Sequence, residues 1–134
     1  MVRHVIALGA ALFVVATDRA AAAVGDPAEG QKASQICRAC HQLGPGAHNS
    51  VGPVLNGVVG RKAGTYPGFQ YSQANKTSGI TWTVDMLKKY LTNPQEVVHG
   101  TKMFFPGFPH DPQKVDNIIA YLQTFGADGQ KVTP

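Results

Sequence analysis

The chain contains 134 residues, of which 12 are Lys or Arg, 8 are Asp or Glu, 5 are His and 2 are Cys. This length suits one domain and argues against a two-domain enzyme, a repeat array and a polytopic membrane protein. The net charge of +4, with 15% charged residues, is too small for a protein that coats nucleic acid, so we expect no nucleic-acid partner. Two cysteines cannot make a disulfide-dense miniprotein, and their spacing must decide between a bridge, a metal site and a cofactor attachment.

The first 23 residues have the layout of a secretory signal peptide. Arg3 precedes an apolar run over residues 5–16, and a cluster of alanines follows. As a helix this run would extend roughly 18 Å, short of the ~30 Å hydrocarbon core, so a retained membrane anchor is the weaker alternative. We expect cleavage near Ala23, export to a bacterial periplasm, and one domain over residues 24–134 with a short C-terminal tail at 126–134.

The chain after the leader is predicted to be mainly α-helical with long ordered loops. Capping residues and apolar periodicity indicate three helices, over residues 27–39, 83–92 and 112–125. Ala33 and Ile36 are the inward candidates of the first helix, with Gly30 nearby, and because these residues are mostly small we expect another element to pack close to the helix. Residues 42–68 are rich in Gly and Pro, which predicts an irregular loop with a functional role.

Both cysteines lie in the sequence Cys37-Arg38-Ala39-Cys40-His41, a signature for covalent attachment of c-type haem. Thiols three residues apart share one helix face, so both can bond to the two vinyl groups along one porphyrin edge. His41 follows where its imidazole can reach the iron. A redox-active dithiol would need a preceding buried strand, and structural zinc would need a second ligand pair, neither of which is evident. The motif therefore predicts one covalently bound haem c.

A second axial iron ligand has five candidates: Met103, Met86, His48, His99 and His110. Met86 falls within a predicted helix, where a methionine more often fills the core. Met103 lies in an irregular segment bounded by glycines, which can bring the backbone close to a ring. Spacing favours Met103 and leaves the histidines open. A filled sixth position favours electron transfer, whereas an open one favours a haem enzyme of the peroxidase type.

Eight short blocks, in this order, resemble class I cytochromes c of the mitochondrial and bacterial cytochrome c2 type. They lie at residues 37–41, 52–57, 60–64, 71–76, 79–82, 90–94, 100–103 and 119–122. The resemblance extends over nearly all of the chain from Gly25 to Phe125. It implies the class I cytochrome c fold, in which about five helices and long ordered loops surround one covalently attached haem. It also implies that His41 and Met103 are the axial ligands of the haem iron.

The resemblance assigns roles to further residues around the haem. Pro53 would accept a hydrogen bond from the His41 imidazole, which fixes the tautomer of that ring. Tyr90 would lie near the Met103 sulfur, and Phe105 would cover the haem edge. Five residues would hold the haem propionates, whose burial requires hydrogen-bond donors: Arg61, Tyr71, Asn75, Trp82 and Thr101.

Two departures from the family pattern concern packing and partner contact. Gly30 and Tyr121 match a close crossing of the first and last helices, but Ala33 replaces a bulky aromatic residue there. Three positions beside the haem edge that are often lysine carry other residues: Ile36, Ser50 and Gln95. Three lysines remain as candidates for a docking face: Lys102, Lys32 and Lys89. We expect weak charge steering and a more apolar contact with partners.

The function implied by the resemblance is that of a soluble, exported one-electron carrier with a single haem c, and not of an enzyme. As a monomer without stable membrane insertion, it would shuttle electrons between respiratory or photosynthetic membrane complexes. Its transient partners would come from four classes: a bc1-type complex, a terminal oxidase, a reaction centre and a dehydrogenase. Small interfaces suit such partners, since a carrier must release quickly.

Overall fold

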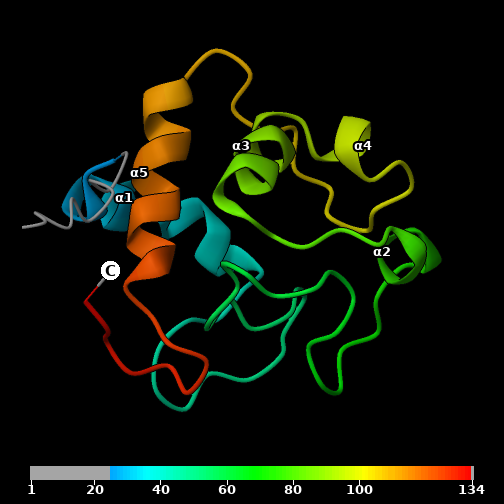
Figure 1. The fold of residues 1–134 in the computed structure, drawn as a ribbon, viewed down its shortest axis with the longest axis horizontal. Helices are drawn as coiled ribbons and strands as arrows, with labels where there is room; N and C mark the ends of the chain where they lie inside the picture. The colour runs from blue at the N-terminus through cyan, green and yellow to red at the C-terminus, as the bar shows by residue number, and fades with distance from the viewer. Residues whose placement is uncertain (1–24, 134) are drawn as a thin grey trace, which may run out of the picture.

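The computed structural model describes residues 25–133, so the expected signal peptide over residues 1–23 lies outside the described part. Residues 25–133 contain five α-helices and one 3-10 helix in this order (Figure 1): α1 Pro27–Ala33, η1 Ser34–Ala39, α2 Gln73–Thr77, α3 Val84–Thr92, α4 Pro94–Val97 and α5 Pro112–Gln123. Extended pairing within these residues is limited to two isolated bridges, Lys62 with Thr81 and Phe125 with Lys131. The mainly helical prediction is confirmed. No helix within residues 25–133 is long and apolar enough to cross a bilayer.

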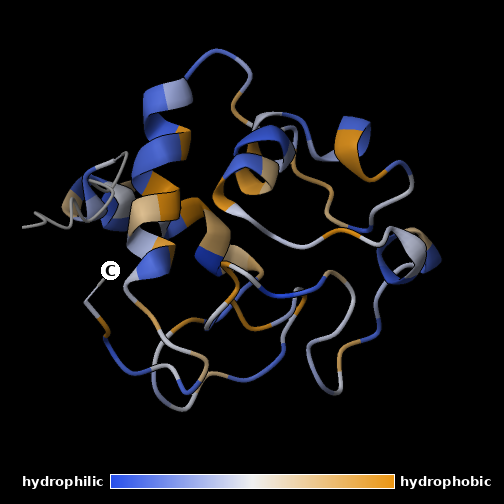
Figure 2. Ribbon diagram, in the orientation of Figure 1, coloured by the Kyte–Doolittle hydropathy of each residue, from blue (hydrophilic) through white to orange (hydrophobic). Residues whose placement is uncertain are grey.

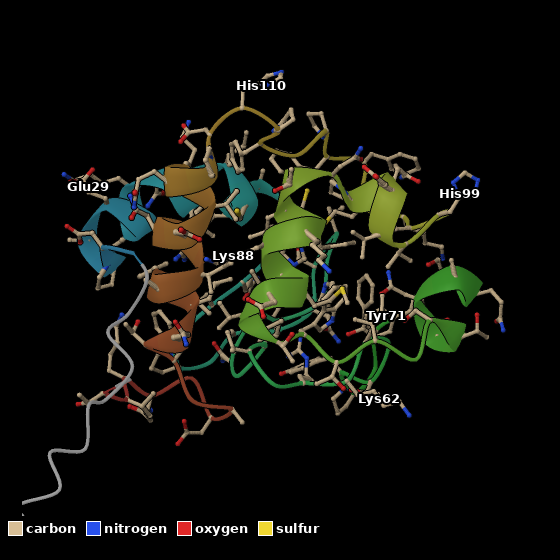
Figure 3. All side chains as sticks on the ribbon, turned by 45° about the horizontal axis from the view of Figure 1, so that its top comes forward. Glu29, Lys62, Tyr71, Lys88, His99 and His110 are labelled. Carbon is tan, nitrogen blue, oxygen red and sulfur yellow. The ribbon has the colours of Figure 1, made fainter. Side chains whose placement is uncertain are left out.

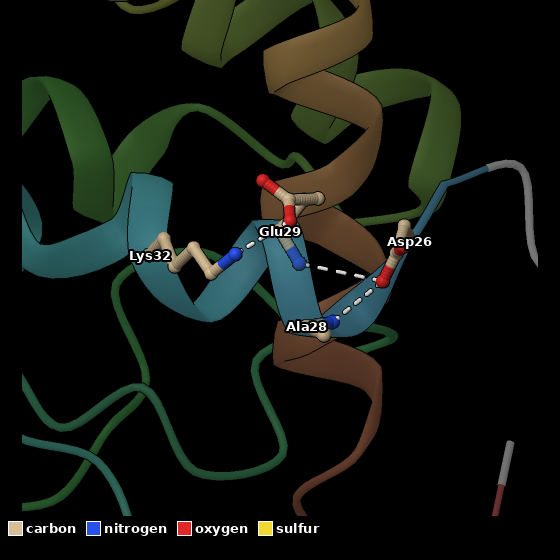
Figure 4. A network of polar contacts seen from close by, with 4 residues as sticks. All are labelled: Asp26, Ala28, Glu29 and Lys32. Carbon is tan, nitrogen blue, oxygen red and sulfur yellow. Dashed lines mark hydrogen bonds and ion pairs between the residues drawn. The ribbon is translucent and has the colours of Figure 1, made fainter.

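The first predicted helix begins where its capping residues indicate. The Asp26 carboxylate accepts hydrogen bonds from the amides of Ala28 and Glu29 at 2.7 and 3.3 Å, and Lys32 pairs with Glu29 at 2.7 Å (Figure 4). These contacts satisfy amides that have no partner inside the helix. The predicted range was right in extent, but the chain changes to the tighter 3-10 form at Ser34.

Helix α1 crosses α5 at a point where only glycine fits. A Cβ atom on Gly30 would lie 1.8 Å from the Asn117 carbonyl oxygen and 2.8 Å from Tyr121 Cβ. The expected close crossing at Gly30 and Tyr121 is therefore present. The prediction that Ile36 faces inward was wrong, because Ile36 is 57% exposed. Ile36 lies in η1, beyond the crossing, where α5 no longer covers the helix face.

Helix α5 packs on α3 through the apolar stripe predicted for residues 112–125. Its buried members are Val115, Ile118, Ile119 and Leu122, and they share one core with Leu87, Tyr90 and Leu91 of α3. Figure 2 shows how hydrophobic and hydrophilic residues alternate around α5, as expected for a helix with one buried face. The helix ends at Gln123, earlier than predicted, because Phe125 instead pairs with Lys131 of the C-terminal segment.

Two short helices, α2 and α4, were not predicted individually. Ser72 and Asn93 cap them, and each side-chain oxygen accepts a hydrogen bond from an amide three residues later. Asn93 therefore ends α3, as predicted, and also starts α4, whose first residue is Pro94. A four-residue helix has too little periodicity to be distinguished from a turn.

Residues 42–68 form an irregular loop, as predicted, and side-chain hydrogen bonds hold its backbone in place. The Asn56 side chain accepts a hydrogen bond from Gly44 N at 2.7 Å and donates to Gly44 O at 2.9 Å. Asn49 likewise donates to Pro67 O and accepts from Val54 N. Side chains thus replace the missing secondary structure, and the loop can hold functional groups in fixed positions.

Candidate functional site

The two thiols lie at the end of η1. The amides of Cys40 and His41 both donate to Cys37 O, at 3.1 and 2.9 Å, which closes a tight turn around the motif. Both cysteines are free thiols, with Cys37 half-buried and Cys40 exposed. Burial raises the pKa of Cys37, whereas a redox-active dithiol requires a lowered thiol pKa. The raised pKa of Cys37 does not fit the dithiol alternative.

His41 is held in a single orientation by the loop that follows it. Its Nδ1 atom lies 2.7 Å from Pro53 O, and because a carbonyl can only accept, Nδ1 carries the hydrogen. The ring also lies against Gly52, where an added Cβ atom would come within 2.4 Å of the imidazole. Burial lowers the pKa of His41, against the hydrogen bond to Pro53, which raises it. A neutral imidazole with an available Nε2 lone pair results, as a metal ligand requires.

A second cluster surrounds the hydroxyl of Thr101, a residue that is only 3% exposed. Its Oγ1 atom contacts Asn75 Nδ2 at 3.3 Å, Tyr90 OH at 3.0 Å and Met103 N at 3.2 Å. A hydroxyl oxygen has two acceptor positions, and the N–H groups of Asn75 and Met103 fill both. The Thr101 hydrogen must then point to the Tyr90 oxygen, which leaves the Tyr90 hydrogen free to donate. Burial raises the pKa of Tyr90 and keeps it a neutral donor.

A third cluster joins Arg61 to two tyrosines. The guanidinium donates to Asn56 O at 3.1 Å and to Val54 O at 3.0 Å, and it lies 4.9 Å from the centre of the Tyr66 ring. Tyr66 N donates to the Tyr71 hydroxyl at 3.2 Å. The Tyr71 hydroxyl accepts that bond, so its own hydrogen is available to another acceptor.

Trp82 links the second and third clusters. Its ring packs against Tyr90 with a centroid separation of 4.6 Å, and its amide donates to Arg61 O at 2.9 Å. The indole is buried, so it also belongs to the core, as an aromatic residue with a polar tip often does. Trp82 thus contacts both Tyr90 of the second cluster and Arg61 of the third.

The remaining candidates are distributed as follows. Met86 packs against the core cluster of α3 and α5, as its helix predicts. His48, His99 and His110 are exposed, and Figure 3 shows His99 and His110 projecting from the surface. Phe105 stacks edge-on against Phe108 with ring centres 5.0 Å apart. Within residues 25–133, no group of three or more His, Cys, Asp or Glu side chains could hold a metal ion.

Sequence reasoning missed two contributors to these clusters. Tyr66 is not among the site residues predicted above, although it contacts both Arg61 and Tyr71. Gln95 was noted only as a missing lysine, although its side chain bonds to the turn before Met103. A tyrosine five residues before another in a glycine-rich loop is a weak signal, and a surface glutamine gives none.

Comparison with known proteins identifies the family. No family model matches the chain. Cytochrome c2 of Blastochloris viridis is 52% identical over 120 residues, which covers 90% of this chain and 94% of that protein. Cytochrome c2 of Rhodoblastus acidophilus is 58% identical over 107 residues, covering 80% and 99%.

Solved structures agree with these sequence relationships. Cytochrome cH from Methylobacterium extorquens matches with a TM-score of 0.70 and 52% identity, over 75% of this chain and 99% of that chain. Cytochrome c2 from Rhodospirillum centenum matches with a TM-score of 0.72 and 38% identity, over 76% and 99%. The chain therefore belongs to the class I cytochromes c of the cytochrome c2 type, which are electron-transfer proteins with one covalently attached haem c rather than enzymes.

Proposed function

We propose that this protein carries single electrons between membrane redox complexes, with haem c bonded to Cys37 and Cys40 and with His41 and Met103 as axial ligands. The observation that carries this proposal is the position of the His41 imidazole, whose Nδ1 atom is held 2.7 Å from Pro53 O, so that Nε2 is the ring nitrogen left for the iron. His41 directly follows two free thiols at the spacing that haem attachment requires.

The residues present fit a haem group. Gly52 leaves room for the His41 ring, and a side chain there would displace it. When bound, haem c would supply an iron that takes up and releases one electron. Cys37 and Cys40 would fix its edge, and His41 would hold one axial position.

Met103 would hold the other axial position through its thioether. Its amide is tied to Thr101 Oγ1 inside the cluster that also holds Tyr90. The free Tyr90 hydrogen is a donor within this cluster, and we assign it to the Met103 sulfur. A thioether ligand opposite an imidazole raises the reduction potential, and hydrogen bonding to the sulfur tunes it further.

The five residues named above, Arg61, Tyr71, Asn75, Trp82 and Thr101, are proposed to hold the propionates, with Thr101 acting through the hydrogen bond that it accepts from Asn75. Arg61 and Tyr71 each retain donor hydrogens beyond the bonds described above, and both contact Tyr66. Trp82 connects them to Asn75 through Tyr90 and Thr101. Such donors lower the cost of burying two carboxylates, and Phe105 would cover the exposed haem edge.

Electron transfer then needs no change in protein bonding. His41 and Met103 would hold the haem in both oxidation states, and the bound haem would supply a site that accepts one electron from a reduced partner and passes it to an oxidised one. The alternative, a peroxidase-type enzyme, would need Met103 to leave an open position. The hydrogen bond from its amide to buried Thr101 favours the carrier.

The partner contact is proposed to be apolar with weak charge steering. Phe104, which follows Met103 in the sequence, is 92% exposed. Val51, which precedes the Gly52 that packs on His41, is 74% exposed. Lys32, a candidate for the docking face, is instead paired with Glu29. Transient partners of the classes named above would bind here through a small interface.

We also propose that residues 1–23 are a signal peptide removed near Ala23, that the domain is residues 24–134, and that the protein acts as a monomer in a bacterial periplasm. Intact mass spectrometry of the purified protein tests cleavage and haem attachment together. We expect the mass of residues 24–134 plus one haem. Replacing both Cys37 and Cys40 by Ser should release the haem, and a haem that stays covalently bound would contradict the proposal.

Carbon monoxide distinguishes the carrier from the enzyme. The reduced wild-type protein should bind carbon monoxide slowly and weakly, because Met103 occupies the iron. Rapid binding of carbon monoxide by the wild-type protein would favour a peroxidase-type enzyme.

A further inference from the structure

The turn between α4 and Met103 is closed by a side chain. Gln95 is the second residue of α4 and is exposed. Its Oε1 atom accepts a hydrogen bond from Gly100 N at 3.3 Å, and its Nε2 atom donates to Thr101 O at 3.2 Å. One amide group thus bonds to two consecutive residues of the turn.

Backbone bonds alone leave this turn incomplete. Val98 N donates to Pro94 O at 3.0 Å and Thr101 N donates to Val98 O at 2.9 Å. Among residues 25–133, Gly100 N and Thr101 O have no hydrogen-bond partner other than Gln95. Gly100 has φ +89°, a conformation that glycine adopts freely and that backbone preference alone does not fix. Gln95 supplies the missing constraint.

The constraint reaches Met103 through Thr101. The Thr101 carbonyl is bonded on the outside to Gln95, while its hydroxyl is bonded on the inside to Met103 N and the Tyr90 cluster. We infer that Gln95 is a positioning residue that closes the turn before Met103 and so holds this methionine on the iron. This inference rests on the proposed function, in which Met103 is an axial ligand.

Glutamine suits this task better than the lysine often found at this position in the mitochondrial type. A lysine ammonium could donate to Thr101 O, but it has no acceptor for Gly100 N. The amide has both, in one rigid plane. At this position the chain therefore has a side chain that can hydrogen-bond to two residues of the turn, in place of a positive charge that could steer partners.

Displacement of Met103 by added imidazole measures how firmly the turn is held. Imidazole binds only when Met103 has left the iron, so its apparent affinity rises with the population of the open turn. Gln95→Leu removes both bonds at similar size. Each exposed bond of this kind contributes a factor of a few, so the variant should bind imidazole about five to ten times more tightly. The titration uses oxidised holoprotein at one pH and follows the long-wavelength band of methionine-bound ferric haem.

Gln113→Leu is the matched control, because Gln113 follows Asp111-Pro112 as Gln95 follows Asn93-Pro94. Its amide donates to Asn117 Oδ1 at 3.0 Å, on α5. We expect its imidazole affinity to stay within about twofold of wild type. Gln95→Lys, which keeps only a donor, should be intermediate.

Three results would overturn the inference. They are a Gln95→Leu affinity equal to wild type, an equal rise in both leucine variants, and a Gly100 amide in the wild-type holoprotein that exchanges with solvent at the unprotected rate. The exchange measurement needs no variant to fold. A wild-type protein without the methionine band would instead contradict the proposed function, so the two failures are distinguishable.

Discussion

Replacing Thr101 by Val should destabilise the protein strongly, because one hydroxyl serves three partners, of which Asn75 and Tyr90 are buried and Met103 is partly buried. The change keeps the shape of the side chain but removes the bonds to Asn75 Nδ2, Tyr90 OH and Met103 N. At about 1 kcal/mol net for each hydrogen bond, the free energy of unfolding should fall by about 3 kcal/mol. The midpoint of thermal unfolding should fall by roughly 10–15 °C for a domain of this size.

Denaturant unfolding of the oxidised holoprotein, followed by the fluorescence of Trp82, measures this loss. Thr101→Ser keeps the hydroxyl and should cost less than about 1.5 kcal/mol, mainly from the lost methyl group. Thr77→Val makes the same change at an exposed position of α2, where among residues 25–133 the Thr77 hydroxyl bonds only to Gln73 O, and should cost less than about 0.5 kcal/mol. A Thr101→Val loss no larger than that of Thr77→Val would refute the role assigned to this hydroxyl.

Three further predictions concern packing, pH and partner contact. Gly30→Ala should lower the free energy of unfolding by about 3 kcal/mol or more in a denaturant melt, because its Cβ atom would lie 1.8 Å from the Asn117 carbonyl oxygen. Gly46→Ala is the control: its Cβ atom would have nothing within 4 Å, so it should cost only about 1 kcal/mol, from the positive φ at this position. Equal losses in the two variants would contradict the close crossing of α1 and α5. Hydrogen bonding to Lys114 lowers the pKa of Asp111. The Asp111 carboxylate therefore stabilises the fold at pH values above its unfolded pKa, and this contribution disappears as the pH falls through the folded pKa. Stability measured from about pH 7 to pH 3 should therefore decline less steeply in Asp111→Asn, and a parallel decline would argue against this pair. The rate of reduction by a purified bc1-type complex should fall less than tenfold between about 0.01 and 0.15 M salt and should drop about fivefold in Phe104→Ala; a steep salt dependence in the wild type would contradict an apolar contact.

Local chemistry determines the parts of this fold that are predictable from sequence. The capping residue Asp26 and the apolar stripe of α5 act within one helix, so their patterns are visible in a few residues. The same holds for Cys37, Cys40 and His41, since attachment chemistry fixes their spacing. These elements needed no knowledge of the rest of the chain.

Tertiary context determines the parts that were wrong or missed. Ile36 is apolar and has the correct helical spacing, but α5 has already crossed the helix and leaves it exposed. Tyr66 and Gln95 acquire their roles only when the loops bring Tyr71 and Thr101 beside them. No local pattern marks such residues, because their partners are separated from them by turns whose geometry is set by the whole fold.

The absorption spectrum of the oxidised holoprotein tests the central claim most directly. The account predicts that the wild-type protein and Met86→Leu both show the long-wavelength band of a methionine bound to ferric haem, and that Met103→Leu lacks it. A wild-type spectrum without this band, or a band that survives in Met103→Leu, would contradict axial ligation by Met103.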